Sequence, residues 1–214
     1  MDPWMQSAER IAVSQTIRGT RVLGIIGPTS NSGPSRLARL IAEAMGRSHL
    51  KVLLVVMNNP ESDVVVGAAD ILSKPWHDIR EDKSRFLDVV AANVTPQTKY
   101  AFNSPSWLET FFAEKLRHYA HIVVDLPPVS DEREDALHPI APASVCESVL
   151  LVCEAGGVTR PILDEALQVL KSAEANVVGL VVNEPGTYAA GEFDTTAEWY
   201  PKRIKPALKS ELPQ

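Results

Sequence analysis

Apolar residues along the chain gather into short runs, separated by longer segments that are apolar on one side only. Within each run, aliphatic residues follow one another without alternating with polar ones, which is typical of strands buried on both faces of a parallel sheet. We therefore predict strands at five such runs and at a sixth, less continuous one: 21–27, 51–57, 121–128, 148–156, 175–183 and 85–92.

The segments between these runs carry apolar residues at helical spacing. After the first run, Leu37, Ile41 and Met45 share one helical stripe, and Gly46 is well placed to end that helix. Two further helices are expected at 104–120 and 159–175. Because strands and helices alternate, the pattern predicts an α/β domain with a doubly wound, mostly parallel sheet.

Three segments lack a clear pattern. Residues 1–20 are interpreted as an N-terminal arm with room for a short helix, and residues 186–214 as a polar C-terminal tail. Residues 58–84 are rich in loop-forming residues, with one small helical piece. The predicted α/β domain therefore spans residues 21–185.

The amino-acid composition limits the classes of function that the protein can have. The chain has 214 residues, of which 45% are hydrophobic and 22% charged, enough to bury the core of one domain. A net charge of −6 argues against a nucleic-acid or anionic-membrane surface. Neither the two cysteines nor the five histidines have metal-ligand spacing. No apolar run approaches the roughly 20 residues that span a membrane, and no signal peptide is recognised, so we expect a cytoplasmic protein without membrane insertion.

The stretch between the first strand and the first strong helix has the context of a phosphate-binding loop. Loop amides and a helix N-terminus can together hold a phosphate, and a lysine and a Ser/Thr normally complete the site. Here a proline, which has neither charge nor N–H, takes the place of the lysine. These residues alone leave two interpretations open, an anion site or a strand-to-helix turn without ligand. The loop consists of Gly27, Pro28, Thr29, Ser30, Asn31, Ser32, Gly33, Pro34 and Ser35.

Several segments together resemble the bacterial tyrosine kinases of polysaccharide export and chain-length control. That family is a branch of the deviant P-loop ATPases, which include the MinD and ParA partitioning proteins. The loop corresponds to the family's G-x-S-P-x-x-G-K-[ST], and "YAHIVVDLPPV" (119–129) corresponds to its third motif. The unit at 148–184 resembles the family's final strand–helix–strand unit. The resemblance covers about residues 20–185 and implies a MinD/ParA-type P-loop fold.

The sequence departs from the family pattern at three site positions. Pro34 replaces the loop lysine, while Val56 and Asn58 stand where the family's second motif has aspartates. The C-terminal region has Tyr188 and Tyr200 rather than a tyrosine cluster. Since phosphoryl transfer depends on charge neutralisation and positioning, we predict a catalytically inactive, pseudokinase-like chain with no catalytic residue.

The resemblance also indicates what remains of a nucleotide site. Asp125 matches the third motif, Asn183 matches an asparagine that contacts adenine in relatives, and Arg160 is a further remnant candidate. Ser35 and Asp125 are the only candidate metal ligands, and each also suits an ordinary structural role, as a helix cap or an acceptor of backbone N–H bonds. We expect no obligatory cofactor or metal, with at most weak ATP, ADP and Mg²⁺ binding.

The leading hypothesis is a cytoplasmic scaffold or regulatory partner in exopolysaccharide or capsule synthesis and export. By resemblance, its partner is the cytoplasmic segment of a membrane chain-length or co-polymerase protein, which recruits it to the inner face of the membrane. Self-association stays open. One alternative is an active ATPase or autokinase that borrows Arg36, Arg160 or a neighbouring subunit's cation. Another is a nucleotide-binding MinD/ParA-like positioning protein.

Overall fold

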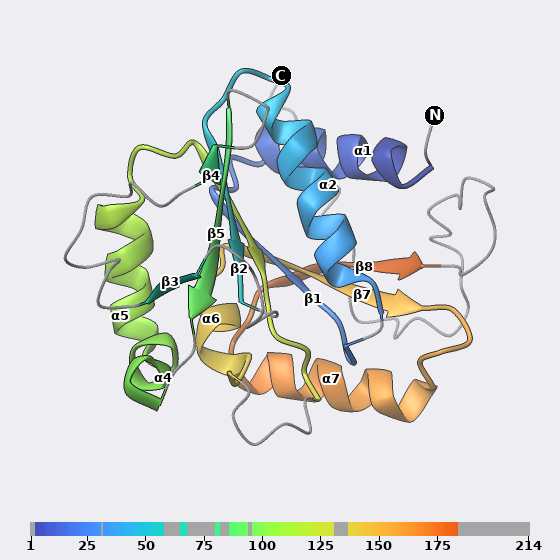
Figure 1. Ribbon diagram of the computed structural model, residues 1–214. Helices are drawn as coiled ribbons and strands as arrows, with labels where there is room; N and C mark the ends of the chain where they lie inside the picture. The colour runs from blue at the N-terminus through green and yellow to red at the C-terminus, as the bar shows by residue number, and fades with distance from the viewer. Residues whose placement is uncertain are drawn as a thin grey trace, which may run out of the picture.

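The computed structural model describes residues 3–30, 32–57, 65–67, 80–81, 86–93, 96–130 and 137–183. These residues form three layers, in which one sheet lies between two sets of helices (Figure 1). The predicted α/β architecture with a mostly parallel sheet is confirmed.

The sheet has the strand order β3-β5-β2-β6-β1-β7-β8, and every pair along this path is parallel. A short extra strand, β4, pairs with β5 in the antiparallel sense. All six predicted strands are present. The strands are β1 (Val22–Ile26), β2 (Val52–Val56), β3 (Val65–Gly67), β4 (Arg80–Glu81), β5 (Leu87–Asn93), β6 (His121–Asp125), β7 (Ser148–Glu154) and β8 (Val177–Asn183).

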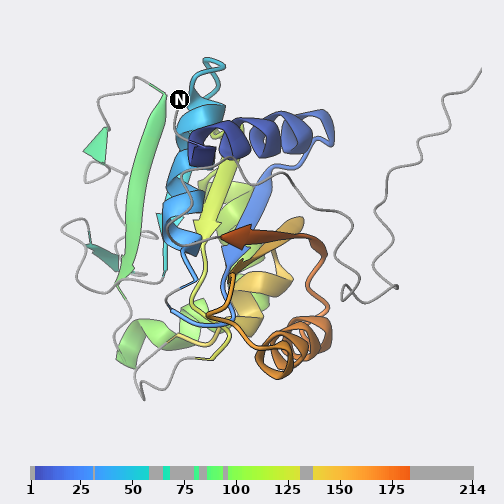
Figure 2. The same cartoon turned by 90° about the vertical axis from the view of Figure 1, so that its right-hand side faces the viewer.

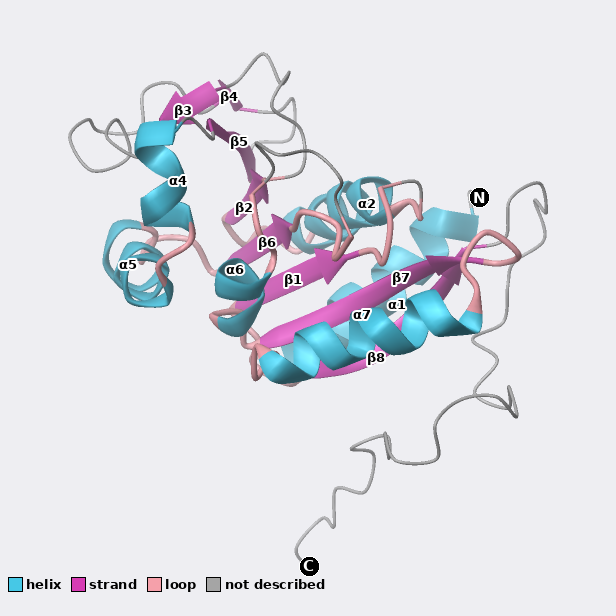
Figure 3. Cartoon of the chain, turned by 90° about the horizontal axis from the view of Figure 1, so that it is seen from below, coloured by secondary structure: helices cyan, strands magenta, loops and turns pink. Residues whose placement is uncertain are grey.

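Helices cover both faces of the sheet. Two of them, α1 and α2, lie over one face, and the others lie over the opposite face, where α7 runs along β7 and β8 (Figures 1 and 3). The helices are α1 (Pro3–Ile17), α2 (Pro34–Gly46), α4 (Pro96–Phe102), α5 (Pro105–Thr110), the π-helix η1 (Phe111–Lys115), α6 (Ile140–Ser144) and α7 (Arg160–Ser172).

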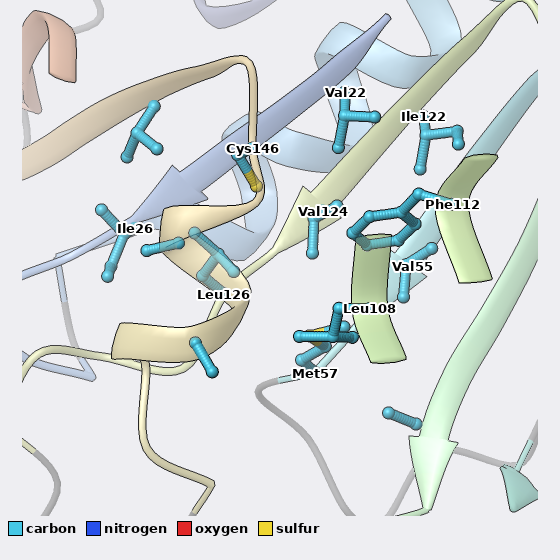
Figure 4. Packing of buried hydrophobic residues seen from close by; sticks show 14 of the residues in the cluster. Val22, Ile26, Val55, Met57, Leu108, Phe112, Ile122, Val124, Leu126 and Cys146 are labelled. Atoms are coloured by element: carbon cyan, nitrogen blue, oxygen red, sulfur yellow. The ribbon is translucent and has the colours of Figure 1, made fainter. Parts of the chain in front are cut away.

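Each face of the sheet carries its own apolar core. On one face, residues such as Leu23 and Ile25 of β1 pack against Leu37 and Ile41 of α2. On the other face the cluster joins the sheet to α5, η1, α6 and α7, and Figure 4 shows its central side chains. Because successive residues of a strand point to opposite faces, runs that are apolar throughout supply both cores at once.

The first twenty residues differ from the predicted arm. Residues 3–17 form the continuous helix α1, and its side chains Ala8, Ile11 and Ala12 are buried against the α2 side of the core. The spacing of these buried positions places them on one helical face. The prediction of an arm is therefore wrong, because α1 is part of the folded body and covers the sheet beside α2 (Figure 2).

The predicted helix at 104–120 is also interrupted. It begins as α5 but continues as the π-helix η1, which ends at Lys115. The guanidinium of Arg21 donates hydrogen bonds to the carbonyls of Phe112 (3.0 Å) and Leu116 (2.7 Å). Arg21 therefore adds side-chain donors near the end of this segment, where the Leu116 carbonyl also accepts a hydrogen bond from Tyr119 N–H (3.0 Å).

Strand β8 lies at the edge of the sheet, so the prediction that it is buried on both faces is wrong. Most of its residues are only half-buried, and Val182 is 50% exposed. Helix α2 ends at Gly46, as predicted. Of the predicted loop at 58–84, only β3 and β4 are described, and the tail at 186–214 lies outside the described residues. Within the described part of the chain, no helix has the length and apolar character needed to cross a membrane.

Candidate functional site

The phosphate-loop segment lies where β1 ends and α2 begins, at the carboxyl edge of the parallel sheet. Gly33 has φ 88°, a left-handed conformation that favours glycine, and Pro34 is the first residue of α2. The carbonyl of Gly33 accepts the first helical hydrogen bond, from Leu37 N–H (3.3 Å). Glycine thus makes a turn that few other residues tolerate, and proline occupies the position where no helical partner for its N–H would exist.

The loop is tied firmly to the body of the protein. Gly27 accepts a hydrogen bond from Val129 N–H (3.0 Å), and Pro28 accepts one from the Ser130 hydroxyl (2.8 Å). The side chain of Ser32 is fully buried and lies 3.1 Å from the Thr29 hydroxyl oxygen. Asn31 lies outside the described residues, and Ser30 is exposed. The loop is thus a well-packed turn whose polar groups are used largely within the protein.

Asp125 ends strand β6 beneath the start of α2. It is 2% exposed, and a side-chain hydrogen bond links it to Ser35 in the first turn of α2. Its Oδ1 atom has no hydrogen-bond partner. Burial raises the pKa of this carboxyl to about 7, against the smaller, opposite effect of the Ser35 hydrogen bond. The structure therefore brings together Ser35 and Asp125, the two candidate metal ligands, and leaves one carboxylate oxygen available.

The end of strand β2, where the kinase pattern has its second motif, does not place a charged residue next to Asp125. Strands β2 and β6 pair so that Val56 is the register partner of Asp125. Val56 packs against the α2-side apolar core, so the side chain at this register position is uncharged and joins that core. Asn58 lies outside the described residues. Among the residues described, no group of three or more His, Cys, Asp or Glu side chains is arranged to hold a metal ion.

Asn183, at the end of β8, reaches across to the loop. Its Nδ2 donates a hydrogen bond to the carbonyl of Ser32 (3.3 Å), although 151 positions separate the two residues. The same Nδ2 would lie 3.0 Å from a Cβ added to Gly33. Glycine at position 33 therefore allows the close approach of this amide as well as the left-handed turn.

The N-terminal helix supplies a site residue that the sequence analysis did not identify. Trp4 lies against the loop at Gly33. A Cβ atom added to this glycine would lie 3.4 Å from Cη2 of the Trp4 ring. Its indole also lies beneath the guanidinium of Arg36, 4.9 Å from the ring centroid. The signal was present in the sequence, since Trp4 is in helical register with the buried Ala8, Ile11 and Ala12.

The two arginines proposed as substitute cations are engaged elsewhere. Arg36 stacks on Trp4, and Arg160 forms an ion pair with Asp164 one turn along α7, at 3.7 Å. Arg160 is largely exposed at the start of α7, which follows the carboxyl end of β7. The structure thus joins Ser32, Gly33, Asn183 and the Ser35–Asp125 pair, and records no contact of Arg160 with them.

These residues do not fit a magnesium nucleotide held for phosphoryl transfer. The first helical position lacks both an N–H and a cation, and the register position beside Asp125 is apolar. The indole of Trp4 approaches the glycine that precedes α2, with its Cη2 atom 3.4 Å from the position of an added Cβ. What persists is the backbone turn, one hydroxyl and one buried carboxyl of raised pKa.

Comparison with known proteins supports the resemblance seen in the motifs. The chain is 26% identical over 171 residues to "Putative tyrosine-protein kinase CapB" of Staphylococcus aureus, which covers 75% of this chain and 73% of CapB. No protein-family model matches the chain.

Solved structures show the same fold. The kinase domain of Escherichia coli tyrosine kinase ETK aligns with a TM-score of 0.69 at 19% identity, over 88% of this chain and 79% of ETK. The MinC:MinD cell division complex of Aquifex aeolicus aligns with a TM-score of 0.59 at 19% identity, over 76% of this chain and 68% of the other. The predicted resemblance to the bacterial tyrosine kinases and the predicted P-loop NTPase-like fold are both confirmed.

Proposed function

We propose that this chain, similar in sequence and fold to the bacterial tyrosine kinases, is a non-catalytic scaffold or regulatory partner in exopolysaccharide or capsule synthesis and export. In this role the α/β fold supplies a docking surface, and phosphoryl transfer has been lost. The similarity to a capsule-type kinase homologue supports the process, and the geometry of the loop supports the loss of catalysis.

The observation that carries the proposal is Pro34 at the first position of α2. A lysine at this position in the kinase motif places a full positive charge on the transferring phosphate. Proline supplies no charge, and it also lacks the N–H that would point towards an anion. Preorganised electrostatic contacts of this kind contribute roughly 2.7–4 kcal/mol each, or about 10²–10³ in rate.

A second loss reinforces the first. Val56 is the register partner of Asp125, so this pair of described residues offers one buried carboxyl where the family pattern provides two. Fewer carboxylates weaken the grip on magnesium, which in phosphoryl transfer neutralises the developing charge. Loss of a cation and of a metal ligand from one site leaves little basis for catalysis.

We propose that the partner is the cytoplasmic segment of a membrane chain-length or co-polymerase protein, and that the chain acts at the inner face of the membrane through it. This partner is inferred from the resemblance to the kinase family. A second candidate function is nucleotide binding without turnover, as in a MinD/ParA-like positioning protein. The preserved Ser35–Asp125 pair with its unpartnered Oδ1 favours it.

Titration of the purified protein with ATP and Mg²⁺, followed by assays of ATP turnover and tyrosine phosphorylation, tests the proposal. The kinase domain of ETK serves as the positive control. We expect neither binding at micromolar concentration nor turnover. Binding without turnover would favour the positioning protein, and turnover or phosphotyrosine would refute the non-catalytic role.

Complementation in the source bacterium tests the process independently. Deletion of the gene should reduce surface polysaccharide, and the wild-type gene should restore it. We expect Ser35→Ala and Asp125→Asn to restore it equally well, since neither side chain serves catalysis in a scaffold. Failure of these two variants, at normal protein levels, would show that the loop site has a chemical role.

A further inference from the structure

We propose that Trp4 is a built-in cover of the loop, so that α1 controls access of a phosphate-bearing ligand to the N-terminus of α2. This inference deepens the proposed function, because it assigns part of the loss of nucleotide binding to the N-terminal helix. It stands on the contacts of Trp4 with Gly33 and Arg36 and on the buried carboxyl of Asp125, which is linked to Ser35 in the first turn of α2.

The position of the indole provides the first argument. Gly33 immediately precedes α2, whose first-turn N–H groups have no helical acceptors and form the positive end of the helix dipole. Trp4 Cη2 approaches Gly33 closely enough that an added Cβ would lie 3.4 Å from it. An apolar ring at this place excludes water and anions from the end of the helix where an anion would be most stable.

The indole of Trp4 also contacts Arg36, the positively charged residue in the first turn of α2. The Arg36 guanidinium lies 4.9 Å from the centroid of the Trp4 ring, within the range of a cation–π interaction. An arginine one turn into a helix is the nearest replacement for the missing lysine in the loop. Stacking on Trp4 places this charge against α1, and removal of the ring takes away one of its contacts.

A carboxyl next to the first turn of α2 retains an oxygen without a hydrogen-bond partner. Asp125 is 2% exposed, is linked to Ser35 in the first turn of α2, and has an Oδ1 atom without a hydrogen-bond partner. A buried acceptor without a donor is unfavourable, and a hydrogen-bond donor or a cation such as the Mg²⁺ that accompanies a phosphate would satisfy it. The feature points to a ligand-binding place that is closed in this conformation.

The cover can open at modest cost because α1 is anchored elsewhere. Ala8, Ile11 and Ala12 hold the middle of α1 to the core, whereas Trp4 lies in its first turn and is only partly buried. First turns of helices fray with small free-energy changes, so Trp4 can leave the loop while α1 stays docked. Removal of the indole alone should therefore uncover the loop without unfolding the helix.

Inorganic pyrophosphate with Mg²⁺ is the appropriate probe, because it carries two phosphates but no base that could itself stack on Trp4. We expect Trp4→Ala to bind pyrophosphate at least tenfold more tightly than the wild type in calorimetric titrations. Amide ¹H–¹⁵N shifts should change at Ser32, Gly33 and Ser35. Val13→Ala, a change at a 60% exposed position of the same helix, is the matched control and should bind as the wild type does.

Equal binding by the wild type and Trp4→Ala, including no binding by either, would overturn the cover. Shift changes confined to other parts of the protein would overturn it as well, since they would indicate binding to unrelated surface cations. If Trp4→Ala does not unfold cooperatively, Trp4→Leu keeps an apolar anchor while removing the ring over Arg36, and the same criteria apply. ATP turnover by the wild type would instead refute the non-catalytic role, so failures of the two proposals are distinguishable.

Discussion

The buried carboxyl of Asp125 makes the stability of this protein depend on pH in a direction opposite to that of most acidic residues. Its surroundings are apolar or neutral, with Val56 as its register partner and the Ser35 hydroxyl as a single side-chain hydrogen-bond partner. Burial raises its pKa from 3.8 to about 7. We predict that Asp125→Asn stabilises the protein above neutral pH and has little effect in acid.

The sign follows from the protons bound by each state. Between about pH 4 and pH 7 the folded protein holds a proton on Asp125 that the unfolded chain has already released. The free energy of unfolding therefore decreases as the pH rises through this window, by up to about 1.4 kcal/mol per unit. The full decrease is about 4 kcal/mol, complete above pH 7, and it is an upper bound if water enters on ionisation.

Urea unfolding monitored by circular dichroism, at intervals from acid to mildly alkaline pH, measures this effect. The quantity of interest is the difference between variant and wild type, because other groups that titrate in both proteins cancel. Asp164→Asn is the control, since Asp164 is half-exposed on α7 and pairs with Arg160. A difference for Asp125→Asn that does not grow with pH, or that grows equally for Asp164→Asn, would refute the reasoning.

Magnesium provides a second arm of the same experiment. If Asp125 and Ser35 bind the ion, Mg²⁺ at alkaline pH should raise the midpoint of wild-type unfolding but leave Asp125→Asn unchanged. We expect no such selective increase, because one carboxylate and one hydroxyl are a sparse ligand set for a hard dication. A selective increase would show that the metal-binding part of the site has survived.

Three further predictions concern the loop and the opposite edge of the sheet. Gly33→Ala should destabilise the protein by about 1–3 kcal/mol in urea unfolding, and by more than Gly19→Ala. Both glycines have positive φ, but only at Gly33 does the Asn183 amide lie 3.0 Å from the added Cβ. Equal effects of the two changes would argue against this contact. Pro34→Lys should not restore ATP turnover or tyrosine phosphorylation, because Val56 remains beside Asp125; activity in this variant, absent from Pro34→Ala, would show that the lysine was the only decisive loss. Tyr119→Phe should lower the free energy of unfolding by about 1.5–3 kcal/mol, because the buried Tyr119 hydroxyl donates a hydrogen bond to Asp88 at 2.7 Å. Tyr100→Phe, at an 83% exposed position, should change the free energy of unfolding by less than about 0.5 kcal/mol. A similar effect of both changes would contradict the assignment of this hydrogen bond.

Much of the fold was predictable because the parallel strands are buried on both faces. Runs such as 51–57 and 121–128 are apolar apart from Lys51, His121 and Asp125, and few structures other than a covered parallel sheet bury such runs so fully. The turn at Gly33 and Pro34 was equally predictable, because backbone stereochemistry restricts which residues suit a left-handed turn and the start of a helix.

Other elements depended on the sheet's layout. The end strand β8 has the same apolar sequence character as the central strands, yet it lies at the edge and is half-exposed. The helix after residue 104 changes to a π-helix, and Arg21, about ninety positions away, donates hydrogen bonds to the carbonyls of Phe112 and Leu116. Local sequence could not predict either feature, because each depends on which segment lies alongside.

The sequence by itself determined the strand–loop–helix frame and the absence of charge at positions 34 and 56, because residue identity fixes backbone preference and charge. Only the tertiary structure decided that Asp125 is buried beside a valine, that Asn183 reaches the loop, and that Trp4 covers it. These three contacts join residues far apart along the chain, and their strength depends on burial and distance. Both quantities exist only after the layers have packed.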